Sequence, residues 1–255
     1  MNFIGGTFSK AFFKIPSGVL WMQRHLPNLY KTLRSHFSQS GLREGDNIFV
    51  HSSLIPLYYQ LRKTQSFAPE AACSLLYKAI RDTVRTGIMG CLSATWEHEH
   101  HPIDSRGRLP PSHDIGDFSK FLCQKRHSIR TQHPVFSITF NRQKGGQELK
   151  SRLMLTHKYA FGPLSPWHSM LENQFKIVII GLPGIEKLTL IHHIEQLCGV
   201  PYVYNKLIMD KDDTHYYMSV PYQNMEVIYA NQVNLETKLS SAGIIKKHSL
   251  KWALF

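Results

Sequence analysis

A histidine and a glutamate three positions apart are the residues of this sequence best suited to catalysis. They lie in residues 189–195, which read TLIHHIE and follow a short apolar run. Residues three apart share one face of a helix, so Thr189, His192 and Glu195 are expected to project from a single stripe. A histidine with a pKa of about 6.5 can take a proton from a nucleophile, and a carboxylate can fix its tautomer or hold an ammonium group. On spacing alone, a structural histidine beside a surface charge explains the pattern equally well.

Three further segments combine polar groups with turn-forming residues. Residues 130–137 read RTQHPVFS, where an arginine beside a hydroxyl residue could clamp a phosphate, with an exposed turn as the alternative. Residues 50–54 read VHSSL, and small hydroxyl residues after a buried strand leave backbone N–H groups open to a pyrophosphate. Residues 161–167 read FGPLSPW, a rigid turn with an aromatic wall that could stack on a sugar or simply pack as a loop.

Strands and helices that could position these residues alternate along the chain. Apolar runs predict strands, and apolar residues at helical spacing predict helices. The predicted strands are residues 48–50, 135–140 and 176–180, and the predicted helices are residues 22–37, 69–85, 116–125 and 189–197. This alternation predicts a layered α/β fold, in which ligands bind at the carboxyl edge of the sheet.

Three segments carry more specific expectations. The run KIVII at residues 176–180 is predicted to be a strand buried on both faces. Residues 51–53 are predicted to form the loop that leaves the first strand. Residues 95–112, rich in histidine, proline and charge, form a predicted long loop, and long loops in compact domains are usually functional.

The chain is strongly basic. It has 30 Lys and Arg against 18 Asp and Glu, a formal net charge of +12 over 255 residues. Such a charge favours anionic ligands, which include nucleic acids, acidic lipids and phosphorylated small molecules. Because the basic residues are spread along the chain and accompany no nucleic-acid-binding motif, no nucleic-acid partner is expected.

The cysteines and the ends of the chain carry expectations about the cellular compartment. The four cysteines are scattered, a pattern typical of reduced thiols in a cytoplasmic protein. No run of about 18 apolar residues occurs, so no transmembrane helix is expected. Residues 1–40 are predicted to be a basic N-terminal extension that carries the first helix, and its apolar start could contact a membrane surface weakly.

Several familiar ligand motifs do not occur. The segment EHEHH at residues 97–101 lacks the H-E-x-x-H spacing of a zinc helix, so no metal is expected. Neither GxxxxGK[ST] nor GxGxxG is present, which disfavours nucleotide hydrolysis and a dinucleotide site. Residues 142–147, RQKGGQ, lack the last small residue of the Q/R-x-x-G-x-G/A loop that is typical of the small acetyltransferase fold, so this fold is not supported.

Taken together, the four motifs resemble the aminoglycoside 3-N-acetyltransferase family. Family members carry V-H-S-S-L, R-S-x-H-P-x-x-S, G-x-x-S-P and T-x-x-H-x-x-E in that order, matched here by VHSSL at 50–54, RTQHPVFS at 130–137, GPLSP at 162–166 and TLIHHIE at 189–195. Residues 110–116, PPSHDIG, are similar to the family's P-S-x-x-x-G stretch. The resemblance implies an α/β/α domain with a mixed sheet over residues 41–255, distinct from the small acetyltransferase fold, and acetyl-CoA as the co-substrate.

The resemblance also implies roles for particular residues. His192 matches the family's active-site histidine, the candidate general base, with Glu195 as its companion acid and Thr189 on the same stripe. The residues that match the coenzyme-binding segments are His51, Ser52, Ser53, Arg130 and Thr131. The acceptor side is expected to include Trp96, Glu97 and Glu186.

Departures from the family pattern affect mainly the acceptor. Residues 90–96, GCLSATW, replace a run that leads to Pro-Thr-Phe, and Thr131 replaces the usual serine. The acidic residues before T-x-x-H are reduced to Glu186, with Lys187 beside it. Together with the net charge, these changes predict an acceptor that is less cationic than a clinical aminoglycoside and that could carry a phosphate or carboxylate.

Two functions of different classes follow. The first is an acetyl-CoA-dependent N-acetyltransferase that acylates an amino group of an aminoglycoside or amino-sugar by direct transfer. The second is a weakly active or non-catalytic family member that holds an anionic glycan or polymer on its basic surface. The intact Thr189, His192 and Glu195 favour the first.

Overall fold

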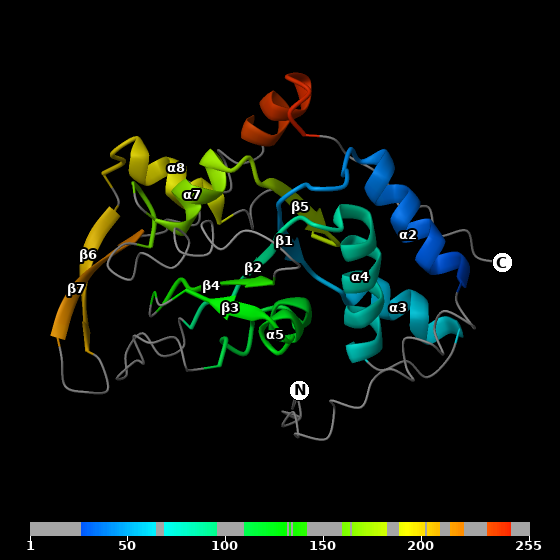
Figure 1. Cartoon of the computed structure of the whole chain (residues 1–255). Coiled ribbons are helices and arrows are strands. Elements are labelled where there is room, and N and C mark those ends of the chain that lie inside the picture. Colours follow the sequence, from blue (N-terminus) through cyan, green and yellow to red (C-terminus); the bar gives the residue numbers. More distant parts are fainter. Residues whose placement is uncertain are drawn as a thin grey trace.

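The computed structural model describes most of the chain from residue 27 onward (Figure 1). The described residues are 27–64, 69–95, 110–131, 133, 135–141, 160–163, 165–182, 189–201, 203–209, 215–221 and 234–245. Within these ranges, no helix is both long and apolar enough to cross a membrane.

A five-stranded mixed sheet forms the centre of the fold, with the strand order β3-β4-β2-β1-β5. Its parallel strands are β1 (Ile48–Ser52), β2 (Met89–Leu92) and β5 (Lys176–Ile180). Its antiparallel strands are β4 (Ile138–Asn141), which pairs with β2, and β3 (Ser128–Arg130), which pairs with β4. The predicted α/β fold with a mixed sheet is therefore confirmed.

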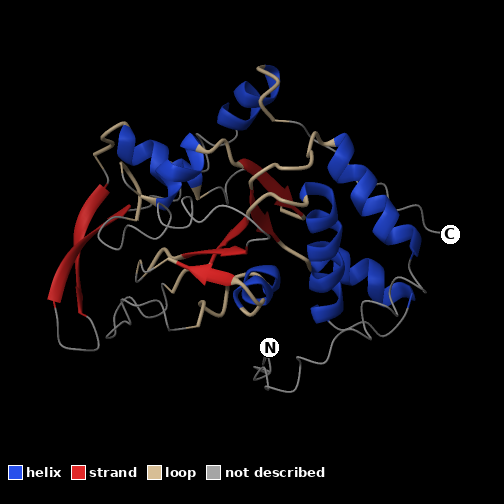
Figure 2. Cartoon of the chain, in the orientation of Figure 1, coloured by secondary structure: helices blue, strands red, loops and turns tan. Residues whose placement is uncertain are grey.

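Helices cover both faces of this sheet (Figure 2). The first face is covered by α2 (Pro27–Gln39), α3 (Ile55–Thr64), α4 (Pro69–Val84) and α5 (Asp117–Cys123). The second face is covered by α7 (Pro166–Glu172) and α8 (Leu190–Leu197). Alternate residues of β1 divide between the two cores, because Ile48 and Val50 pack with the first set of helices and Phe49 packs with the second.

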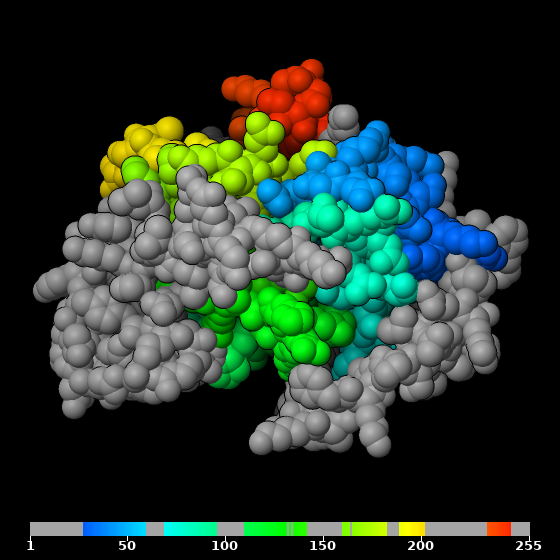
Figure 3. Space-filling view, in the orientation of Figure 1, coloured from blue at the N-terminus to red at the C-terminus, as the bar shows by residue number. Residues whose placement is uncertain are grey.

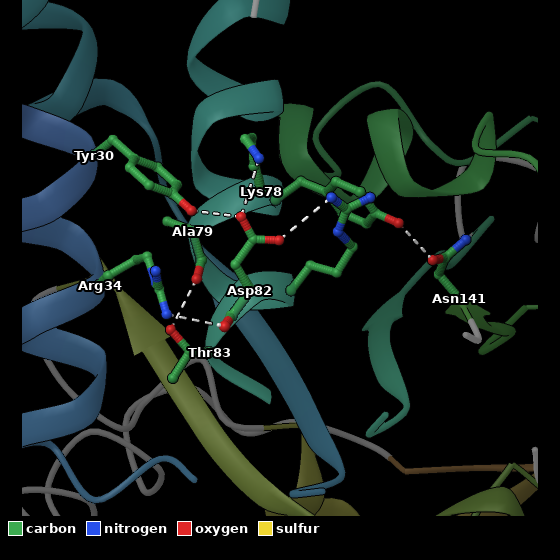
Figure 4. Close-up of polar contacts among 9 residues, drawn as sticks. Tyr30, Arg34, Lys78, Ala79, Asp82, Thr83 and Asn141 are labelled. Atoms are coloured by element: carbon green, nitrogen blue, oxygen red, sulfur yellow. Dashed lines mark hydrogen bonds and ion pairs between the residues drawn. The ribbon is translucent and has the colours of Figure 1, made fainter. Parts of the chain in front are cut away.

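Helix α2 lies against α4 (Figure 3). A polar network joins the two helices in addition to their apolar packing (Figure 4). Asp82 on α4 accepts a hydrogen bond from the Tyr30 hydroxyl and pairs with Lys78 Nζ at 3.0 Å. Arg34 donates from Nη2 to the backbone carbonyl of Asp82 at 3.2 Å. Burial raises the pKa of Tyr30, which keeps its hydroxyl protonated as the donor.

A two-stranded antiparallel ribbon follows α8. It consists of β6 (Val203–Met209) and β7 (His215–Pro221) and lies beyond α8, on the far side of the molecule from α2 (Figure 1). A further helix spans residues 234–241.

Two sequence-based expectations about the strands were wrong. Strand β5 is an edge strand with a partly exposed surface, and Ile179 is 36% exposed, so it is not buried on both faces. Strand β1 continues through Ser52, so His51 and Ser52 belong to the strand and not to the loop after it. An apolar run specifies a strand, but its place in the sheet depends on pairing with distant segments.

Candidate active site

The candidate site lies at the carboxyl edge of the three parallel strands, where β1, β2 and β5 end together. Ser53 N–H donates to the Ile180 carbonyl at 2.9 Å, so the segments that leave β1 and β5 stay in contact. Gly181 has a φ of +66°, and a Cβ atom there would lie 2.2 Å from the Ser53 carbonyl oxygen. Only glycine permits this approach, so the backbones of the two segments lie close together at this part of the edge.

His192 and Glu195 form a hydrogen-bonded pair on α8. His192 Nδ1 lies 2.8 Å from Glu195 Oε2, and each side chain is 15% exposed. An ionised carboxylate can only accept, so Nδ1 carries the hydrogen and Nε2 carries the lone pair. The three-residue spacing predicted from the sequence thus produces a direct contact, and the result is an imidazole with a fixed tautomer.

An aromatic side chain, Phe161, packs beside the imidazole of His192. The Phe161 ring lies 5.7 Å from the His192 ring, centroid to centroid, and is itself fully buried. Phe161 also contacts Phe136 at 5.2 Å and Trp167 at 5.8 Å. The FGPLSPW turn therefore packs beneath the candidate base, and its aromatic residues form core rather than a free stacking surface.

The predicted coenzyme loop presents two of its three side chains to solvent. Ser52 and Ser53 are partly exposed, whereas His51 is only 7% exposed and its ring packs edge-on against Phe49 at 5.0 Å. Burial lowers the pKa of His51 to about 4, so its imidazole is neutral at physiological pH. His51 stabilises the core of the strand, and the serines are left as the groups facing the edge.

Arg130 and Thr131 are both engaged in holding the β3–β4 connection against the end of β2. Arg130 donates from Nε to Ser137 Oγ at 2.7 Å and from Nη2 to the Ser93 carbonyl at 2.5 Å. Thr131 is fully buried, and its hydroxyl accepts from Ile138 N–H at 2.9 Å. The hydroxyl of Thr131 therefore closes the strand connection, and a contact between Arg130 and a phosphate stays a prediction.

The predicted acceptor residues lie outside the described part of the chain. Trp96, Glu97 and Glu186 belong to residues 96–109 and 183–188, as does most of the long loop predicted at 95–112. Thr189, at the start of α8, is nearly buried. Among the described residues, no group of His, Cys, Asp and Glu could hold a metal ion.

His193, the residue beside the candidate base, has a structural role, which the sequence left open for either of the two adjacent histidines. It is fully buried, and its Nδ1 accepts a hydrogen bond from Gly162 N–H at 2.9 Å. Burial, followed by the charge of His168, lowers the pKa of His193 to about 4. The doubled histidine in TLIHHIE is the available signal, because neighbouring helix positions point about 100° apart.

The free energy of unfolding is expected to fall as the pH drops from about 6.5 toward 4. In the folded chain His51 and His193 gain protons only near pH 4, whereas the unfolded chain binds them near its ordinary pKa of 6.5. The unfolded state therefore holds more protons in this window, and each histidine contributes a loss of up to about 1.4 kcal/mol per pH unit.

Urea unfolding at pH 7, 6 and 5 measures this effect. The variant His193→Asn removes one of the two buried imidazoles and should reduce the slope between pH 6 and 5. A free energy of unfolding that stays constant across these three pH values would contradict neutral burial of the two histidines.

Comparison with protein-family models identifies one family. A family model described as aminoglycoside 3-N-acetyltransferase matches residues 82–253, which is more than half of the chain. A search of curated proteins finds no match.

Solved structures match over most of the chain. The structure of AAC-IIIb with CoASH shares 20% identity, covers 84% of this chain and 85% of its own, and has a TM-score of 0.64. An AAC(3)-IVa variant in complex with apramycin shares 18% identity over 87% of this chain and 82% of its own, with a TM-score of 0.63. The YokD protein from Bacillus subtilis shares 15% identity over 84% of this chain and 86% of its own, with a TM-score of 0.61. At these identities the likeness establishes the fold.

Proposed function

The chain belongs to the aminoglycoside 3-N-acetyltransferase family, and from this premise we propose that His192 is the general base in direct transfer of an acetyl group to an amino-sugar. The family makes it an acyltransferase that uses acetyl-CoA. The observation that carries the proposed mechanism is the hydrogen bond of 2.8 Å between His192 Nδ1 and Glu195 Oε2.

The geometry of this pair supports proton transfer at a defined atom. With Nδ1–H donated to Glu195, Nε2 of His192 takes a proton from the attacking amine, and the carboxylate stabilises the imidazolium that forms. The amine nitrogen bonds to the thioester carbonyl carbon, the C–S bond breaks, and the imidazolium returns the proton to the departing thiolate. The products are an N-acetyl amide and the free thiol of coenzyme A.

The coenzyme is proposed to lie along the carboxyl edge of β1. There Ser52 and Ser53 are partly exposed, and Gly181 lets the segment after β5 pass close to the Ser53 carbonyl. An extended pantetheine arm needs such a surface of exposed backbone and small hydroxyl groups. The basic net charge of +12 adds long-range attraction for the phosphates of the coenzyme.

The acceptor is proposed to be less cationic than a clinical aminoglycoside. An enzyme that captures polycations benefits from a negative field, because opposite charge raises encounter rate and specificity. This chain carries 30 basic against 18 acidic residues, which is the opposite arrangement. An amino-sugar that bears a phosphate or carboxylate fits the field better.

Competition at low salt between an aminoglycoside and a nucleotide-linked amino-sugar tests this preference. The release of coenzyme A thiol, followed with each acceptor alone and then together, should give the higher kcat/KM for the nucleotide-linked sugar, and added salt should reduce the advantage. A clearly higher kcat/KM for the aminoglycoside would reject the preference while leaving the transferase assignment intact.

The stability gained from acetyl-CoA, together with thiol release, separates the enzyme from a non-catalytic binding protein. At 100 times its dissociation constant, acetyl-CoA should stabilise a binding-competent transferase by about 2.7 kcal/mol. A protein that binds a polyanion but neither gains stability from acetyl-CoA nor releases its thiol with any amino-sugar would be the alternative instead.

A further inference from the structure

We propose that His193 is a positioning residue for the transferase reaction: by anchoring the turn formed by residues 160–163 and 165 to α8, it holds Phe161 against the candidate base His192. The role rests on the proposed function of His192. His193 itself is fully buried and does not reach a substrate.

The anchor is a hydrogen bond between two separate parts of the chain. Gly162 N–H donates to His193 Nδ1 at 2.9 Å, and Ser165 Oγ lies 3.5 Å from the same nitrogen. Gly162 has a φ of +86°, a conformation that needs glycine. Because the Gly162 backbone is buried, its N–H would be left without a partner if His193 were apolar. An unpaired buried N–H lowers the free energy of unfolding, and such groups are rare in folded proteins.

The anchored turn also begins helix α7. Ser165 caps this helix by accepting from His168 N–H at 3.3 Å, with Pro166 in the first turn. The Ser165 N–H in turn donates to the Gly162 carbonyl at 3.2 Å. The turn is thus closed on itself, and a hydrogen bond to His193 joins it to α8.

Phe161 transmits this position to His192. It directly precedes Gly162, is fully buried, and its ring lies 5.7 Å from the His192 ring. His192 and His193 are neighbours on α8, one partly exposed beside Glu195 and the other buried under the turn. Both imidazoles of α8 therefore contact the turn: His192 through its ring contact with Phe161, and His193 through its hydrogen bond with Gly162.

The surroundings keep His193 available as an acceptor. Accepting at Nδ1 requires the neutral ring with its hydrogen on Nε2. The titratable group of α7 beside it is His168, with ring centroids 5.8 Å apart, and Glu172 Oε1 lies 3.7 Å from Nε2 of that histidine. Burial keeps the pKa of His193 near 4, so the acceptor persists throughout the neutral range.

A matched set of substitutions tests the proposal. In His193→Asn the side-chain oxygen takes the place of Nδ1 and can still accept from Gly162, whereas in His193→Leu the space is filled without an acceptor. His193→Gln carries the same side-chain amide as the Asn variant, but one methylene farther from the backbone. It replaces the leucine variant if that variant does not fold. We expect kcat to fall about 10- to 100-fold for Leu or Gln, with the KM for acetyl-CoA unchanged, and to be largely retained for Asn.

A spectroscopic readout makes the outcome independent of turnover. The ring-proton signals of His192 are shifted by the neighbouring Phe161 ring, and the Gly162 amide signal reports its hydrogen bond. In ¹H–¹⁵N and ¹H–¹³C spectra both sets should move in the Leu or Gln variant and stay near wild type in the Asn variant. This pattern in a protein without turnover would reject the proposed function and keep the positioning role. Unchanged His192 signals and unchanged kcat in the Leu or Gln variant would overturn the positioning role.

Discussion

Replacing His192 with alanine is expected to lower kcat by about 10²- to 10⁴-fold, the usual contribution of general-base catalysis. The substituted chain loses the imidazole that is hydrogen-bonded to Glu195 at 2.8 Å, and with it the group that takes the proton of the amine. Binding of acetyl-CoA should persist, because the partly exposed Ser52 and Ser53 at the end of β1 are untouched. The kcat from thiol release and the dissociation constant from calorimetry measure the two effects.

Two variants control for indirect effects of this substitution. Glu195→Gln keeps a group that can contact Nδ1 but removes the charge that stabilises the imidazolium, so its kcat should fall by less than that of His192→Ala. His36→Ala removes a histidine from α2, on the other face of the sheet, and should leave kcat unchanged. If His192→Ala retained more than half of the wild-type turnover, another group would have to be the base.

Replacing Trp167 with alanine is expected to lower the free energy of unfolding by about 3–5 kcal/mol, the range for removal of a large buried aromatic side chain. Trp167 is fully buried at the start of α7, and its ring lies 4.9 Å from Phe49 and 5.8 Å from Phe161. The substitution therefore opens a cavity between the sheet and the turn below His192. Urea unfolding monitored by circular dichroism measures the loss.

Trp167→Phe is the matched control. The indole Nε1 has no hydrogen-bond partner among the described residues, so phenylalanine removes no such bond and keeps most of the apolar contact. Its cost should be smaller than that of the alanine variant, because phenylalanine leaves a smaller cavity. A loss below about 1 kcal/mol for the alanine variant would show that the aromatic core under the site contributes little to stability.

The sequence by itself determined the features that depend on local periodicity. The alternation of apolar runs and helical patterns predicted the α/β fold, and the spacing of residues 189–195 predicted the contact between His192 and Glu195. The fold prediction succeeds because apolar periodicity specifies the type of each element. The contact prediction succeeds because residues three apart on a helix are neighbours whatever surrounds the helix. Motif order in addition identified the family, which the family model confirms.

The tertiary structure decided which of these residues face the site and which face the core. The apolar strand β5 lies at the edge of the sheet, because its only partner in the described sheet is β1. His51 packs on Phe49, and the hydroxyl of Thr131 accepts from Ile138, while a contact of either residue with the coenzyme stays a prediction. These outcomes depend on pairings between segments far apart in the chain.

The two adjacent histidines show the same division most directly. Helical spacing places His192 beside Glu195, and this local contact follows from the sequence. The burial of His193 follows from a turn some thirty positions earlier, whose amide at Gly162 needs an acceptor. The doubled histidine marks the position but does not name Gly162 as its partner, because the hydrogen bond exists only once α8 packs over the turn and excludes water from it.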